Sequence, residues 1–288
     1  MKVGALFPQT ESSPDPGAIR EFVQAVESMG YAHVLFYDHV LGASPERPGG
    51  WRGRPYTDKD PFHEVLVTFG YLAAVTTQIE LVTGVLVLPQ RQTALVAKQA
   101  AEVDLLAGGR LRLGVGLGWN QVEYEGLGMD FHTRGRRIEE QVEVMRLLWS
   151  QPVVDFKGEF HTISSAGINP MPGRMIPVWM GGTAAAAKVR IARVADGWIV
   201  NTPTEQDPLA AVVEMKELVA AAGRSPKDFG IDIRLSLSHG IEDVAGQIPE
   251  WHELGVSHAT INTMRAGLRW PDGHIDALRL FAAAYRED

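Results

Sequence analysis

Asp38 and His39 are the neighbouring side chains of this sequence best suited to acid–base chemistry. Histidine titrates near neutral pH, so His39 could donate, accept or orient a proton beside a reacting atom. The alternative is a structural histidine that closes the end of a barrel. A metal site would need a third ligand such as His239, and the chain has neither His-x-His nor His-Glu-x-x-His. We therefore predict a catalytic role for His39 and no metal site.

Glycine-rich segments form a second group of candidates. Gly181-Gly182-Thr183 stands directly before a run of alanines, and a glycine turn that opens a helix exposes backbone amides to an anion. We expect phosphate binding there, although a tight turn without a ligand would use the same residues. A flat ring could lie against bare backbone at Gly116, where side-chain bulk is small. Trp119 could stack on that ring or serve as a packed lid residue, and Asn120 adds a carboxamide.

Three arginines form a basic cluster, Arg134, Arg136 and Arg137, at the start of a predicted helix. The helix dipole disfavours cations at that end. The cluster could therefore bind an acidic tail of a ligand, or it could be a solvated surface patch.

Short runs rich in β-branched residues alternate along the chain with segments of helical periodicity. The runs predict strands at Val3–Phe7, His33–Tyr37, Ile79–Leu86, Leu111–Gly116, Val178–Gly181, Gly197–Asn201, Ile231–Ser238 and His258–Asn262. The periodic segments predict helices at Ala18–Met29, Phe62–Thr76, Thr93–Ala107, Ile138–Trp149, Ala184–Val194, Pro208–Ala222, Val244–Leu254 and Ile275–Tyr285. We expect Asp60-Pro61 to begin the second helix, which is apolar on all sides and should be buried against another helix or another subunit.

Eight strands that alternate with helices predict a parallel α/β sheet closed into a (β/α)8 TIM barrel. An open doubly wound sheet is the competing architecture, but residues 7–11 lack its phosphate-binding glycine pattern. We expect residues 1–288 to form a single domain with two excursions, 40–60 and 117–177, over the face where the strands end.

The excursions carry aromatic residues and a possible hairpin. Trp51 and Tyr56 in the first excursion could, with Trp119, line an apolar substrate pocket. The second could contain antiparallel strands at Val153–Phe156 and Phe160–Ile163.

Composition excludes several classes of protein. The chain has no cysteine, so it has no disulfide framework and no thiolate metal site, which suits a cytoplasmic protein. Its formal net charge of −8 offers no basic field for nucleic acid or anionic lipid. Pro8 and Gln9 interrupt the first apolar run before a signal-peptide core could form, and no run is long enough to span a membrane.

These positions together resemble the luciferase-like monooxygenase superfamily, whose barrels use FMN or the deazaflavin coenzyme F420. The resemblance runs the whole chain and rests on Asp38-His39, Thr83-Gly84-Val85, the turn Gly108–Arg110 and the segment from Gly114 to Arg137. Its most specific part is the pattern Gly-Trp-Asn-x-x-Glu-Tyr-Glu-x-Leu-Gly at 118–128. With Gly181-Gly182-Thr183 and Ala195-Asp196-Gly197-Trp198, that pattern is similar to the F420-dependent oxidoreductases.

The resemblance implies roles for individual residues. Thr83, Gly84 and Val85 would form a strand bulge with a cis Gly84–Val85 peptide behind the middle ring of the coenzyme. Asp38 would hydrogen-bond the ring system, and His39 would be catalytic or orienting. The backbone of Gly181 and Gly182 would face the phosphate. The family tendency is a homodimer.

Two departures from the family pattern affect the predicted activity. Trp119 stands where sugar-phosphate dehydrogenases of this family have a proton-donating Glu, so that activity is not expected. Gly135 stands where many FMN enzymes have a Tyr that helps to hold the phosphate, which favours F420.

We therefore predict hydride transfer between F420 and a small organic substrate, with an FMN-dependent monooxygenase as the nearest alternative. A metal-dependent hydrolase or isomerase using His39 and His239 and a non-catalytic cofactor-binding protein remain alternatives of other classes.

Overall fold

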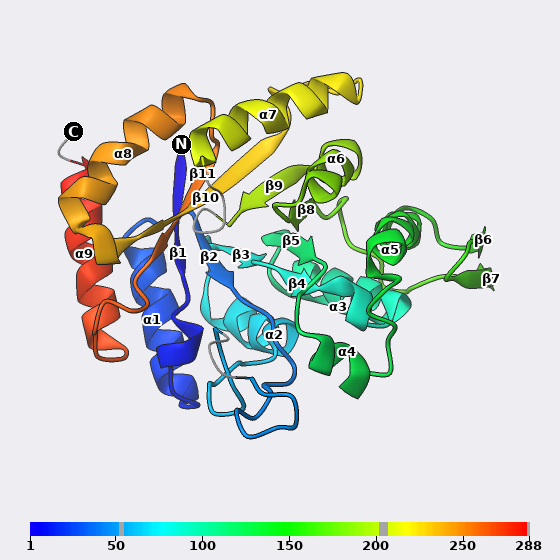
Figure 1. The fold of residues 1–288 in the computed structure, drawn as a ribbon, viewed down its shortest axis with the longest axis horizontal. Helices are drawn as coiled ribbons and strands as arrows, with labels where there is room; N and C mark the ends of the chain where they lie inside the picture. Colours follow the sequence, from blue (N-terminus) through cyan, green and yellow to red (C-terminus); the bar gives the residue numbers. More distant parts are fainter. Residues whose placement is uncertain (52–54, 202–206, 287–288) are drawn as a thin grey trace.

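A computed structural model describes residues 1–51, 55–201 and 207–286. Its main sheet is parallel throughout and follows the order β3-β2-β1-β11-β10-β9-β8-β5-β4, with β3 also paired to β5. The strands of that sheet are β1 (Lys2–Leu6), β2 (His33–Phe36), β3 (Glu80–Thr83), β4 (Leu86–Val87), β5 (Leu111–Gly116), β8 (Val178–Gly181), β9 (Gly197–Val200), β10 (Gly230–Ser236) and β11 (His258–Asn262). The β3–β5 pairing closes the barrel, and the predicted (β/α)8 fold is confirmed (Figure 1).

The third barrel strand is broken in two. Leu81 pairs with Leu111, and Leu86 pairs with Val115, so β3 and β4 both lie against β5. The predicted strand Ile79–Leu86 was therefore wrong in its continuity, because residues 84–85 leave the ladder between the two pieces.

Helices surround the barrel in the expected alternation. They are α1 (Pro16–Ser28), α2 (Val65–Val75), α3 (Thr93–Leu106), α4 (Gln121–Gly126), α5 (Arg134–Ser150), α6 (Ala185–Val194), α7 (Pro208–Ala221), α8 (Ile241–Glu253) and α9 (Asp272–Arg286). The predicted apolar face of α1 is buried, including Phe22 and Val26. An apolar face of this kind holds a surface helix onto a barrel because burial removes it from water.

Six of the eight predicted helices begin one to four residues from their predicted starts, and α2 and α5 show why. Glu64 caps α2 by accepting the Val67 amide, whereas Asp60 accepts the amide and hydroxyl of Thr57 in the preceding loop. Helix α5 starts at Arg134, four residues before the predicted start at Ile138. The apolar periodicity begins only at Ile138, so periodicity gave no signal for that first turn.

The barrel interior has a charged layer and an apolar layer. Arg112 is buried between Asp232 and Glu80, at 3.0 Å from each, and its guanidinium lies 4.3 Å from the ring centroid of Trp179. Above it, a separate apolar cluster fills the lumen toward the carboxyl ends of the strands: Leu6, Leu35, Val82, Trp179, Ile199 and Met264, with Tyr37 and Val85 at its edge. This plug is the floor on which a ligand at the strand ends would rest.

The excursion at 40–60 and helix α4 lie at the same end of the barrel (Figure 1). Residues 52–54 of that excursion lie outside the described residues. The predicted hairpin is present as β6 (Val154–Lys157) and β7 (Thr162–Ala166), which project beyond α5. Among the described residues, no helix combines the length and apolar character needed to cross a membrane.

Candidate active site

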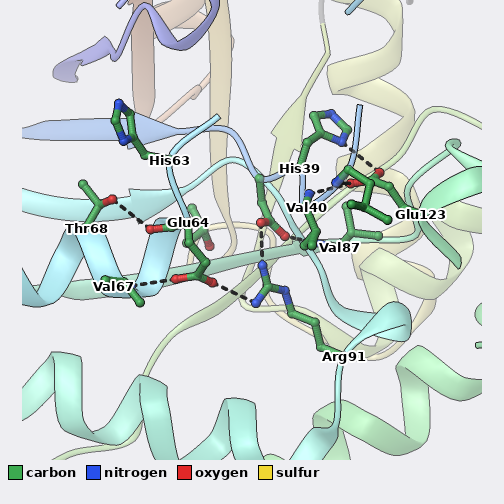
Figure 2. A network of polar contacts seen from close by, with 12 residues as sticks. His39, Val40, His63, Glu64, Val67, Thr68, Val87, Arg91 and Glu123 are labelled. Carbon is green, nitrogen blue, oxygen red and sulfur yellow. Dashed lines mark hydrogen bonds and ion pairs between the residues drawn. The ribbon is translucent and has the colours of Figure 1, made fainter. Parts of the chain in front are cut away.

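Asp38 follows β2 and is tied into the protein by both carboxylate oxygens. Its Oδ2 accepts the Val87 amide at 2.9 Å, and its Oδ1 accepts Nη2 of Arg91 at 2.6 Å. The other arm of Arg91 reaches Glu64, the cap of α2, at 2.8 Å (Figure 2). Burial raises the pKa of Asp38, while the Arg91 guanidinium and the Val87 amide oppose that rise. The network fastens the segment after β4 to β2 and α2.

The contact of Asp38 with a cofactor ring stays a prediction, and within the chain this side chain has a structural role. The carboxylate is 2% exposed, and both oxygens already have partners within the chain. Asp38 therefore serves the site by holding the Val87 segment in place.

Residues 84–85 form the expected interruption of the third strand, and the Gly84–Val85 peptide is cis as the resemblance implied. Val85 is half-buried at the edge of the apolar plug. A Cβ at Gly116 would lie 2.3 Å from the Val85 side chain, and one at Gly181 would lie 2.9 Å from it. These two glycines therefore make room for Val85.

That packing corrects two interpretations of the sequence. The space at Gly116 is filled by Val85, so Val85 covers the backbone there that was expected to meet a ring. Thr83 is fully buried and donates its hydroxyl to the Gly114 carbonyl at 2.7 Å, so its side chain fixes the strand rather than facing a ligand.

His39 is engaged at one ring nitrogen. Its Nδ1 lies 3.0 Å from Oε2 of Glu123 and 2.7 Å from the Tyr56 hydroxyl. In the described parts of the chain, no hydrogen-bond partner is found for Nε2 of His39. The side chain is 16% exposed, so one nitrogen is anchored and the other can meet a ligand.

Glu123, on α4, is the buried centre of this arrangement (Figure 2). Its Oε1 accepts the amides of Val40 and Leu41, and the Tyr56 hydroxyl donates to Oε2 at 3.1 Å. Burial alone would raise the pKa of Glu123, but the hydrogen bonds from His39 and from the two amides outweigh it and hold the pKa below its usual value. Glu123 is therefore an anion at neutral pH.

Asn120 is hydrogen-bonded to the Tyr56 hydroxyl and thereby joins the network around His39. Its Oδ1 accepts the Val122 amide and caps α4, while Nδ2 donates to the Leu41 carbonyl and the Tyr56 hydroxyl. The side chain is buried and its donors are used within the chain. Within the chain Asn120 positions Tyr56, and its contact with a cofactor stays a prediction.

Aromatic side chains surround His39. Its ring centroid lies 3.9 Å from that of Tyr56 and 4.9 Å from that of Phe62. Trp51 and Trp119 stack at 5.5 Å with an interplanar angle of 20°. Trp119 is 38% exposed, whereas Trp51 and Tyr56 are buried. The predicted grouping of Trp51, Tyr56 and Trp119 is confirmed, and it places an apolar wall beside the imidazole.

The Gly181-Gly182-Thr183 turn is half-buried between β8 and α6. Helix α6 has Ala184 as its N-cap, and no side chain caps its first amides. Thr183 is therefore not the helix cap, and the first amides of α6 are not taken up by a capping side chain.

Asn201 follows β9 and His239 follows β10 at the same end of the barrel. Arg234 donates to the Tyr37 hydroxyl and to the Asn201 carboxamide. His239 is exposed on a short 3-10 turn after β10. Across residues 1–51, 55–201 and 207–286, no three His, Asp or Glu side chains come together as ligands of one metal ion would. The predicted metal alternative thus finds no ligand set in this part of the chain.

The three arginines at the start of α5 also make local contacts. The Arg134 guanidinium lies 3.6 Å from the ring centroid of Phe131, and Arg137 donates to Thr133. Arg136 pairs with Glu159 and is exposed. Of the three arginines, Arg136 is thus a solvated side chain, whereas Arg134 and Arg137 are half-buried.

Sequence reasoning missed Glu123, Arg91 and Glu64 as parts of this network. Glu123 stands in the family-like pattern at 118–128, but the pattern gave it no role. Its spacing from Asn120 would suggest a local capping box, whereas the structure directs it to the loop after β2. A contact between residues more than 80 positions apart cannot be recognised from one sequence alone.

The family of the chain is decided by its match to a family model. The model for luciferase-like monooxygenases matches residues 1–265. The chain belongs to this family. A luciferase-like barrel thus explains the broken third strand and the residues gathered after β2.

Relatives of this luciferase-like protein include enzymes of different chemistry. An uncharacterized protein of Mycobacterium tuberculosis is 37% identical over 227 residues, which are 76% of this chain and 77% of that protein. The FMNH2-dependent dimethylsulfone monooxygenase of Pseudomonas fluorescens is 31% identical over 168 residues, or 57% of this chain and 46% of that enzyme.

A solved F420-dependent secondary alcohol dehydrogenase, in complex with an F420-acetone adduct, has a similar fold with a TM-score of 0.76. The two proteins are 16% identical, and the superposition covers 99% of each chain. At that identity the likeness establishes the fold alone.

Proposed function

We propose that this protein is an oxidoreductase that transfers a hydride between coenzyme F420 and a small organic substrate. The observation that carries the proposal is His39, whose Nδ1 is held by Glu123 and Tyr56 while Nε2 is left for a ligand. When bound, the deazaflavin supplies a carbon that accepts or returns a hydride. Oxidation of an alcohol in this way also requires a group that takes the hydroxyl proton.

The residues at the strand ends fit a planar, phosphate-bearing coenzyme. Val85 offers a half-buried apolar surface and packs against the apolar plug that includes Leu35 and Ile199. The first amides of α6, without a side-chain cap, suit a phosphate because the helix dipole favours an anion there. We propose that Val85 supports the ring and that Gly181, Gly182 and Thr183 lie at the phosphate.

His39 is the proton carrier in this proposal. In the oxidising direction the substrate hydroxyl gives its proton to Nε2 of His39. Loss of that proton, together with the hydride acceptor that a bound deazaflavin would supply, would leave a carbonyl group on the substrate. The aromatic wall of Trp119, Trp51 and Phe62 would exclude water and favour an apolar substrate.

An FMN-dependent monooxygenase is the second candidate, favoured by sequence relatives. Besides the dimethylsulfone enzyme, a pyrimidine monooxygenase of Escherichia coli is 36% identical over 165 residues, which are 53% of this chain. Gly135 argues for F420, because the phenol that many FMN enzymes of this family place there is missing. His39, which can accept a proton and whose Nδ1 contacts the ionised Glu123, also suits hydride transfer.

A binding titration tests the choice of coenzyme. The chain has seven tryptophans, and Trp119 lies beside His39, so a bound ring should quench the intrinsic fluorescence. We expect saturable quenching by F420 at micromolar concentrations and none by FMN over the same range. Saturation by FMN alone would contradict the proposal.

A variant pair then tests the role of His39. His39→Asn should retain F420 binding and lose turnover at least a hundredfold, within the usual range for removal of an acid–base group. His252→Asn, at an exposed position in the last turn of α8, is the matched control and should behave as wild type. Equal turnover of the two variants would remove His39 from the chemistry.

We also propose a homodimer formed through α2. Val67 is 70% exposed and Tyr71 is 38% exposed on this helix, whose opposite face is buried through Leu66, Phe69 and Leu72. Exposed apolar side chains on such a helix suit association. Sedimentation equilibrium should give a dimer mass for the wild type and a monomer mass for Val67→Glu. A monomeric wild type would contradict this proposal.

A further inference from the structure

Tyr56 and Glu123 reach His39 from two separate segments that follow it in the chain. Tyr56 comes from the excursion after β2, where Trp51 holds it by donating Nε1 to the Tyr56 carbonyl at 2.9 Å. Glu123 comes from α4, whose start is capped by Asn120. The two side chains converge on one atom of His39, because both the hydroxyl and the carboxylate lie within hydrogen-bond distance of Nδ1.

The hydrogens of this network can be assigned from the donors and acceptors. Burial and the nearby Glu123 charge raise the pKa of Tyr56, so the phenol keeps its proton. Asn120 donates to the Tyr56 oxygen, which leaves the phenol to donate to Glu123. Glu123 is ionised and can only accept. An unprotonated Nδ1 would set its lone pair against that carboxylate at 3.0 Å, so Nδ1 must carry the hydrogen.

We propose that Glu123 and Tyr56 are positioning residues of the reaction, which together hold the Nδ1 proton of His39 so that Nε2 is the nitrogen presented to the substrate. The inference rests on the proposed function for its consequence in turnover. The neutral ring then enters the oxidising direction with an unprotonated Nε2 and can take a proton there. The opposite tautomer would present a hydrogen to the hydroxyl and could not act as its base.

Nuclear magnetic resonance tests the tautomer in the protein without coenzyme. In ¹⁵N-labelled wild type, at a pH where His39 is neutral, the ring should be protonated on Nδ1, with the resonance assigned by its loss in His39→Asn. Glu123→Gln removes the anion, and the ring should change to the Nε2-protonated form. A wild-type ring protonated on Nε2, or an unchanged tautomer in Glu123→Gln, would overturn the proposal.

Tyr56→Phe provides a second test that spares the carboxylate and the packing of the aromatic ring. With F420 and an alcohol substrate, kcat should fall about tenfold because one hydrogen bond is lost, while KM stays within about twofold. Tyr31→Phe also loses one hydroxyl, which donates to the Leu278 carbonyl on α9, and should leave both constants unchanged. An unchanged kcat in Tyr56→Phe would refute the role of Tyr56.

Failure of this inference can be told apart from failure of the proposed function. If F420 does not bind but the wild-type ring is protonated on Nδ1, the positioning of His39 stands and the coenzyme is wrong. If F420 binds and the ring is protonated on Nε2, the positioning is wrong and the coenzyme stands.

Discussion

Removal of Arg91 should destabilise the protein strongly through its effect on Asp38. In Arg91→Met the Asp38 carboxylate keeps the Val87 amide but loses the guanidinium at 2.6 Å. Asp38 is 2% exposed, so water cannot replace the lost partner. An uncompensated buried charge of this kind costs about 3–5 kcal/mol of unfolding free energy. The pair with Glu64 adds little, because the Glu64 side chain is 37% exposed.

Urea unfolding followed by circular dichroism measures this cost. The double variant Asp38→Asn/Arg91→Met removes both charges and should recover more than half of the loss. Arg269→Met is the matched control. Arg269 pairs with Asp272 at 3.0 Å, but its side chain is 83% exposed, so its removal should cost less than about 1 kcal/mol.

Two results would refute the reasoning on Arg91. A cost for Arg91→Met below about 1 kcal/mol would show that Asp38 does not depend on the guanidinium. A double variant as unstable as the single one would show that the loss arises from packing rather than from the stranded charge.

Two further predictions concern the barrel interior. Burial lowers the pKa of His258 from 6.5 to about 3. Between these pH values the unfolded state binds a proton at His258 and the folded state does not, so the free energy of unfolding falls as the pH drops from 6.5 toward 3. Between pH 6.5 and 5 the wild type should lose about 2 kcal/mol more than His258→Gln in urea unfolding, and equal losses would contradict this. Gly114→Ala would place a Cβ 2.0 Å from the Thr83 carbonyl oxygen and should lower the unfolding free energy by about 2 kcal/mol or more. Gly70→Ala, in α2 with open space around it, should raise it by about 0.5–1 kcal/mol, and a loss as large as that of Gly114→Ala would refute the steric account.

The barrel could be predicted because its strands are apolar runs buried on both faces. The predicted bounds of Leu111–Gly116, Val178–Gly181 and His258–Asn262 agree with β5, β8 and β11. Parallel strands with both faces covered give such runs. The break after Thr83 could not be derived from these runs, because Val85 and Leu86 continue the apolar pattern. The glycine at position 84 is typical of a bulge, and the family resemblance placed the interruption there.

The candidate site was predicted in its location but less well in its contacts. His39 and the aromatic residues were expected at the strand ends, and they are there. Asp38, Thr83 and Asn120 were expected to meet a cofactor, but burial and internal hydrogen bonds occupy them. A polar residue at a strand end can serve a ligand or another loop, and the choice depends on loops distant in sequence. Glu123, 84 residues from His39, shows this dependence.

Isotope transfer tests the central claim most directly. The protein, loaded with F420, is given an alcohol substrate deuterated at the carbon that bears the hydroxyl, and the reduced coenzyme is analysed by mass spectrometry. The account predicts one deuterium in the coenzyme for each carbonyl product formed. Product formed from bound FMN and oxygen, with no deuterium in any F420 present, would contradict it.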